Sequence, residues 1–162
     1  MQEVERGGCG ALKKDIKLVV EEIEKHRQRL AYARDKIMRF GLSLESLQDP
    51  DKVQVVDSFV FRFSKMQDSM SQKLFPLVLR LLEEEVEGLP FLDVLNKLEK
   101  LNFLPSSQRW KQLRLLRNFL THDYPWEEEN RLEVIKQAIE ASYYMEEVFE
   151  LIKTKLKDRG LL

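Results

Sequence analysis

The sequence is poor in the residues that cross-link a chain or interrupt its helices. Its 162 residues include one cysteine, Cys9, together with five prolines and six glycines. One cysteine cannot form a disulfide within the chain, and it excludes a metal site built from several cysteines. Because proline and glycine are the strongest helix breakers, their scarcity favours a helical protein.

Long apolar runs are also absent. No run approaches the roughly 18 residues that indicate a transmembrane helix, and the first residues lack the basic-then-apolar pattern of a signal peptide. We therefore expect a cytoplasmic protein with no membrane partner. The formal net charge of −1 argues against nucleic-acid binding through bulk charge, so any such binding has to be local.

Helical periodicity is what the sequence does contain. Hydrophobic residues make up 43% of the chain and charged residues 34%, and no segment alternates apolar and polar residues as a half-buried strand would. Apolar residues recur at helical spacing from Ala11 to Phe40 and from Leu132 to Leu156. We predict one domain, residues 1–162, folded as an all-α, up-and-down bundle of about four to five helices, with residues 1–10 flexible.

Shorter elements are expected between the two long helices. Residues 43–50 are predicted to form a loop, Asp49 supplies a start signal for the next helix, and Pro76 should kink or split that helix. Its continuation is expected to reach Val86. A short helix over residues 91–101 follows, with a predicted buried face of Leu92, Leu95, Leu98 and Leu101.

Side chains that could take part in catalysis are concentrated from Arg117 to Tyr124, at the end of a segment of good helix formers. Pro125 ends this helix because it lacks an amide hydrogen and disfavours the helical conformation of the preceding residue. At about 100° per residue, Asn118 and His122 lie on one stripe, with Arg117 one position round. The partial negative charge at this helix end favours a protonated imidazole.

These residue types suit RNA cleavage. The reaction needs a base for the 2′-hydroxyl, an acid for the leaving 5′-oxygen and a cation for the extra negative charge on phosphorus. His122 can act as base or acid, and Arg117 can hold the phosphate through two hydrogen bonds. Asn118 can orient the imidazole or the ribose. One histidine supplies one proton-transfer group, so a symmetric dimer is expected to supply the second.

Local positive charge accompanies the motif. From Lys100 to His122 the charged residues are all basic, and we take Arg109, Lys111 and Arg114 as candidate RNA contacts beside Arg117. Two further basic residues, Arg62 and Lys65, lie among phenylalanines, where a solvated helix edge and a phosphate contact are both open. The histidines and carboxylates have no metal-ligand spacing, so we expect neither a metal nor a cofactor.

Arg117, Asn118 and His122 together resemble the Arg-x4-6-His signature of the HEPN superfamily, in which a polar residue usually follows the arginine. With Tyr124 the motif becomes Arg-x4-His-x-Tyr, which is similar to the HepT toxins of the MNT–HEPN toxin–antitoxin systems. The position of the motif adds to the resemblance, because it lies between a leucine-rich helix and a long final helix in an all-α chain.

The resemblance implies a homodimeric helical bundle whose two motifs line a shared cleft, with Arg117 and His122 as the catalytic pair of a metal-independent endoribonuclease. It also implies a toxin of a type VII-like toxin–antitoxin system. The partner would be an MNT-type nucleotidyltransferase antitoxin that transfers AMP from ATP to Tyr124. An anionic AMP group two residues from His122 would fill the cleft and repel an RNA phosphate.

Two other interpretations stay open at the level of sequence. In the first, the chain is a non-catalytic binding subunit that presents Tyr124, or a nucleotide, to a nucleotidyltransferase. In the second, it is a helical interaction protein, and Arg117 and His122 only satisfy the free carbonyl groups and the dipole at a helix end.

Overall fold

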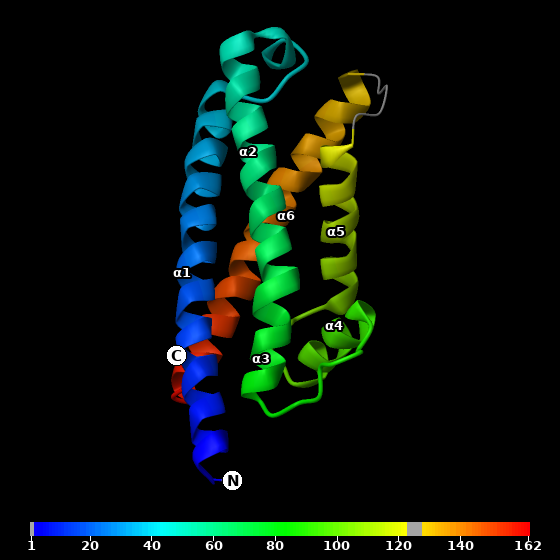
Figure 1. Ribbon diagram of the computed structural model, residues 1–162. Coiled ribbons are helices and arrows are strands. Elements are labelled where there is room, and N and C mark those ends of the chain that lie inside the picture. Colours follow the sequence, from blue (N-terminus) through cyan, green and yellow to red (C-terminus); the bar gives the residue numbers. More distant parts are fainter. Residues whose placement is uncertain (1, 123–127) are drawn as a thin grey trace.

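The computed structural model describes residues 2–122 and 128–162, and these two ranges contain helices and no strand (Figure 1). The elements in chain order are α1 (Gln2–Phe40), a 3₁₀ turn η1 (Ser46–Gln48), α2 (Pro50–Ser69), a π-helical turn η2 (Met70–Leu74), α3 (Phe75–Leu81), α4 (Phe91–Lys100), α5 (Ser107–Thr121) and α6 (Glu128–Asp158). The predicted all-α class is confirmed. Within the same ranges, no helix is both long and apolar enough to cross a membrane.

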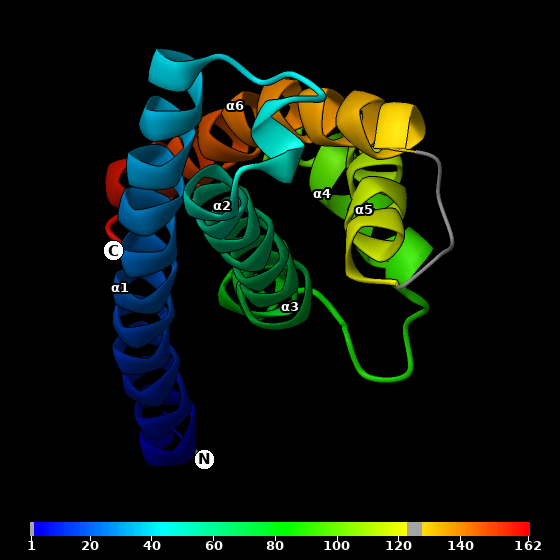
Figure 2. The same cartoon turned by 90° about the horizontal axis from the view of Figure 1, so that it is seen from above.

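Helix α2 is the centre of the molecule. Seen from the side and from above, it lies between α1 and α5, and α6 passes behind it (Figures 1 and 2). Helices α1, α5 and α6 all pack against α2, and α5 also packs against α6. Within the described residues, the α2 positions Ser58, Phe61 and Lys65 are exposed, so the helix keeps one open face.

The core is built from the apolar stripes of the three longest helices. Burying a large apolar side chain stabilises the fold by roughly 1.5–3 kcal/mol, and each helix contributes several. The fully or almost fully buried residues include Ile16, Ile23, Leu30 and Ile37 from α1, Val56, Phe59, Phe63 and Met66 from α2, and Ile135, Met145, Phe149, Ile152 and Leu156 from α6. The apolar positions predicted in the two long helices α1 and α6 thus form the core together with those of α2.

The expected interruption near Pro76 takes the form of the π-helical turn. The backbone N–H of Phe75 donates to the carbonyl of Met70, five residues back, and α3 begins there with Pro76 in its first turn. Proline lacks an N–H, and its ring crowds the preceding helical turn. A widened turn just before it relieves that crowding and lets the helix continue on a slightly different course.

The connections follow the sequence signals in part. The Asp49 carboxylate caps α2 by accepting from the Asp51 N–H at 3.0 Å, and Gly41 ends α1 with a φ of 75°. Helix α1, however, begins at Gln2, well before the apolar pattern that starts at Ala11. Because polar residues continue a helix that the following apolar stripe already anchors, pattern alone placed its start too late.

Two details of the third and fourth helices differ from the prediction. Helix α3 ends at Leu81 and not near Val86, because Glu83 adopts a φ of 61° and the Glu84 N–H bonds back to the Leu79 carbonyl at 2.9 Å. The run of glutamates that follows is unfavourable at the negative end of a helix dipole. In α4, Leu92 is 49% exposed, since the helix buries its other face through Val94, Leu95 and Leu98.

Candidate functional site

Contacts in its first turns hold helix α5 in place, and they set the orientation of the motif at its C-terminal end. Ser106 is its N-cap, and the Ser106 hydroxyl accepts from the Arg109 N–H at 3.2 Å. Trp110 is fully buried and packs edge-on against Phe75, with ring centroids 4.6 Å apart. The Trp110 indole N–H donates to the Ser71 hydroxyl at 3.0 Å, so the π-helical turn of the neighbouring helix anchors α5.

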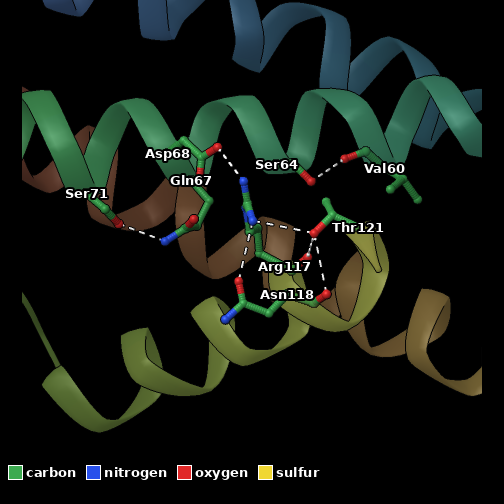
Figure 3. Close-up of polar contacts among 8 residues, drawn as sticks. All are labelled: Val60, Ser64, Gln67, Asp68, Ser71, Arg117, Asn118 and Thr121. Atoms are coloured by element: carbon green, nitrogen blue, oxygen red, sulfur yellow. Dashed lines mark hydrogen bonds and ion pairs between the residues drawn. The ribbon is translucent and has the colours of Figure 1, made fainter. Parts of the chain in front are cut away.

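The Arg117 guanidinium lies in the space between α5 and α2 (Figure 3). Its Nη2 donates to Asp68 Oδ2 at 2.9 Å, and Nη1 lies 3.4 Å from both Asn118 Oδ1 and Thr121 Oγ1. The Arg117 and Asp68 side chains are only 30% and 28% exposed. Nε is buried and has no hydrogen-bond partner among the described residues. The cation is therefore oriented, and Nη1, whose contacts with Asn118 and Thr121 are long, retains donor capacity for a ligand.

A polar pocket of about 230 Å³ adjoins this guanidinium. Its wall combines charged, amide and hydroxyl groups from four elements: Gln67 and Asp68 from α2, Ser71 and Gln72 from η2, Phe91 from α4, and Arg114, Arg117 and Asn118 from α5. The Arg114 guanidinium stacks 4.0 Å from the centre of the Phe91 ring. Two arginines beside neutral donors are groups that can bind a phosphate. The negative charge of the Asp68 carboxylate would repel that phosphate.

His122 is the residue at which the helical geometry of α5 stops. Helix α5 ends at Thr121, and His122 is its C-cap with an extended backbone, φ −93° and ψ 137°. The Thr121 hydroxyl donates to the Arg117 carbonyl at 3.0 Å. The same hydroxyl lies 3.4 Å from the Asn118 carbonyl, one of the last free carbonyls of the helix. His122 is exposed at the end of α5.

Tyr124 and Pro125 lie outside the described residues, so the predicted modification site and the proline break stay predictions. The remaining motif residues are placed clearly: Arg117 is half-buried against α2, Asn118 is exposed and lines the pocket, and His122 follows directly after α5.

The three basic side chains of α5 that were candidate RNA contacts lie in three different environments. Only Arg114 shares the pocket with Arg117. Arg109 stacks 3.8 Å from the centre of the Tyr144 ring of α6. Lys111 lies near Glu99, where a hydrogen bond from the Ser107 N–H lowers the pKa of the Glu99 carboxyl and Lys111 adds to that effect. The basic run in the sequence is thus not one continuous surface.

Asp68 is the site residue that sequence reasoning missed. It lies 49 positions before Arg117, in a helix whose sequence shows only an ordinary polar position there. No spacing rule connects the two, because their contact depends on how α5 packs across α2. The signal that the sequence does carry is weaker: an acidic side chain on the outer stripe of a helix that is apolar on several faces.

Comparison of the chain with protein-family models, curated proteins and solved structures found no match.

Proposed function

We propose that this protein is a metal-independent endoribonuclease of the HEPN type and the toxin of a HepT-like, type VII-like toxin–antitoxin system. The observation that carries the proposal is the Arg117 guanidinium. It is oriented by Asp68 and lines a polar pocket together with Arg114, where its Nη1 makes only long 3.4 Å contacts with Asn118 and Thr121. The Arg-x4-His-x-Tyr sequence around it, which resembles the motif of those toxins, supports the same function.

In the proposed reaction the scissile phosphate binds in the pocket beside Arg117. The guanidinium stabilises the charge that builds up on the nonbridging oxygens as the 2′-oxygen attacks phosphorus. Asp68 holds one edge of the guanidinium, so the phosphate uses the remaining donors and shares Nη2 with the carboxylate. The products are a 2′,3′-cyclic phosphate and a free 5′-hydroxyl, which need one proton removed and one proton supplied.

His122 is the proton-transfer group in this proposal. It follows α5 directly and is exposed, so substrate can reach its imidazole. One imidazole cannot serve both oxygens in the same step unless it moves between them. A homodimer that joins two copies of this helix end supplies a second His122, one as base and the other as acid.

Modification of Tyr124 would control the toxin. An MNT-type nucleotidyltransferase antitoxin would transfer AMP to the Tyr124 hydroxyl, with release of pyrophosphate from ATP. Tyr124 is two residues from His122 in the sequence. The added phosphate would place negative charge beside the site that has to receive the RNA phosphate, and like-charge repulsion would exclude the substrate.

The deciding experiment compares cleavage of total RNA in EDTA by the wild type, His122→Ala and Arg117→Lys, with dimer mass measured for each. We expect cleavage by the wild type, no cleavage by His122→Ala and a loss of about 100-fold for Arg117→Lys, since lysine keeps the charge without the paired donors. Arg109→Ala, which removes a cation facing α6, serves as the control and should retain activity.

Other outcomes would reject the nuclease. Equal cleavage by the wild type and His122→Ala would place the activity elsewhere or in a contaminant. No cleavage by any of them, after intact mass has shown Tyr124 to be unmodified, would favour a non-catalytic binding subunit of a nucleotidyltransferase. In that case AMP transfer to Tyr124 should still be observed with the partner present.

A further inference from the structure

One aromatic side chain of α2 is exposed although its neighbours are buried. Phe59 and Phe63 are fully buried, whereas Phe61 is 50% exposed. The Arg62 guanidinium lies 5.0 Å and the Lys65 ammonium 5.6 Å from the centre of the Phe61 ring. An exposed ring flanked by two cations is a surface to which a nucleobase and its phosphate can bind together.

The positive charge beside the Phe61 ring extends onto α1. Arg62 Nη1 lies 3.3 Å from His26 Nδ1, and the pKa of Arg62 is lowered by burial and by the nearby Arg29. Carboxylates in the same region are already paired, Glu22 with Lys73 at 2.9 Å and Asp57 with Arg131 at 3.8 Å. The edge between α1 and α2 thus carries an excess of cations.

This surface continues into the Arg117 pocket. Phe61, Lys65 and Asp68 follow one another at helical spacing on the open face of α2, and Asp68 holds Arg117 at 2.9 Å. The seven residue steps from Phe61 to Asp68 rise about 10 Å along the helix axis. Since α2 lies between α1 and α5 (Figures 1 and 2), a strand that enters from the α1 side reaches Phe61 before Arg117.

We infer that Phe61, with Arg62 and Lys65, forms a stacking site for an unpaired base of single-stranded RNA, a short distance along the strand from the phosphate at Arg117. The inference rests on the proposed function and adds the substrate class: a single strand, because a base in a duplex cannot offer its face to the ring. A symmetric contact between two copies through this face is disfavoured, since it would bring the Arg62 and Lys65 cations of both copies into one interface.

The test measures binding of a short, fluorescein-labelled single-stranded RNA of mixed sequence by fluorescence anisotropy at fixed salt. All variants carry His122→Ala so that the RNA stays intact. We expect Phe61→Ala to weaken binding on the order of ten-fold and Phe61→Trp to restore it, because stacking needs a ring and not a particular residue. A duplex of the same sequence should bind equally with and without the Phe61 ring.

Tyr32→Ala is the matched control. Tyr32 is 65% exposed, and the Lys36 ammonium lies 4.7 Å from its ring centre, but it belongs to α1, which α2 separates from α5 (Figure 2). Its removal should leave RNA affinity unchanged. Equal losses for Tyr32→Ala and Phe61→Ala would overturn the inference, because binding would then follow any exposed aromatic residue.

The stacking site and the nuclease can fail separately. RNA cleavage in EDTA that depends on His122, together with unchanged RNA affinity in Phe61→Ala, would overturn the stacking site and leave the nuclease intact. Weaker RNA binding by Phe61→Ala in a protein that cuts no RNA would support the stacking site and reject the nuclease. If Phe61→Ala dissociates the dimer but leaves RNA affinity unchanged, this face serves self-association and the inference is overturned.

Discussion

At the scale of single residues, the pairing of Arg117 with Asp68 is the feature with the most functional content. The carboxylate has two opposing effects on a phosphate ligand. It orients the guanidinium, and it competes with the phosphate for Nη2, which it binds at 2.9 Å. Because both side chains are about 30% exposed, the ion pair contributes at most about 1 kcal/mol to stability, and its main effect should be on the site.

Asp68→Asn separates these two effects in the proposed reaction. The amide oxygen still accepts a hydrogen bond, but the competing negative charge is lost. We expect KM for an RNA substrate to fall several-fold, and kcat to fall as well because the guanidinium is held less firmly. Steady-state cleavage of a labelled RNA measures both constants. If neither constant changes, Asp68 has no role in positioning Arg117 for catalysis.

His26, at the boundary between α1 and α2, should make the stability of the fold depend on pH. Burial lowers its pKa below the ordinary value of 6.5, and the neighbouring Arg62 lowers it further; Lys65 and Arg29 act in the same direction and Glu22 opposes them. The unfolded chain therefore takes up a proton at this position at a higher pH than the folded chain. The His26 contribution to stability is present above the unfolded pKa and is lost as the pH falls below it.

His26→Gln should remove this part of the pH dependence. Urea unfolding measured between about pH 7.5 and about pH 5.5, the range in which histidine titrates, is expected to show a smaller decline in stability for the variant than for the wild type. Parallel declines for the two proteins would mean that His26 is as free to take up a proton in the folded state as in the unfolded state.

At the scale of elements, the π-helical turn joins the central helix to α5 through Ser71. Its hydroxyl accepts from Gln67 Nε2 at 2.7 Å and from Trp110 Nε1 at 3.0 Å, and all three side chains are buried. A π-turn inside a long helix often marks a functional region. Here it presents one small polar residue to the helix that carries the motif, and so it helps to set where Arg117 lies.

Ser71→Ala should test this connection. The substitution leaves two buried donors without an acceptor, which costs roughly 1–3 kcal/mol, and it should also lower RNA cleavage because α5 is held less firmly. Urea denaturation and cleavage assays measure the two effects. Ser58→Ala, at an exposed position of α2, is the control. A loss for Ser71→Ala no larger than for Ser58→Ala would show that the buried bonds carry little energy.

Some features of the helices could be predicted from the sequence and others could not. The apolar periods of α1 and α6, the start signal at Asp49 and the interruption near Pro76 are local signals, and the structure confirms each of them. The end of α3 and the burial of Leu92 were predicted wrongly. Both depend on details that lie beyond periodicity: a residue in the left-handed region at Glu83, and the face by which α4 meets its neighbours.

At the scale of the whole molecule, Arg34 ties the first helix to the last. It is only 6% exposed, donates to the Ser142 hydroxyl at 3.0 Å, forms an ion pair with Glu146 and stacks 4.0 Å from the centre of the Tyr143 ring. Since burial removes both charges from water, each is tolerated only while the other is present. The pair therefore specifies how α6 lies against α1.

Arg34→Met should destabilise the protein by roughly 3–5 kcal/mol, because it leaves the Glu146 carboxylate partly buried without its partner. The double variant with Glu146→Leu should recover most of that loss, since two apolar side chains replace the ion pair. Thermal or urea unfolding of both variants measures the difference. A double variant as unstable as Arg34→Met would indicate that the packing around Arg34, and not its charge, determines stability.

Features that depend on neighbours along the chain can be predicted from the sequence alone. Helices, caps and core stripes follow from periods of a few residues, and the Arg-x4-His-x-Tyr motif is read from one short segment. The contact between Asp68 and Arg117 could be seen only in the packed helices. The same holds for the pocket that Arg114 shares with them while Arg109 faces α6, and for the place of Phe61 on the open face of α2. The physical reason is that these relations depend on how helices far apart in sequence pack together, and packing is set by the shape and volume of the whole core.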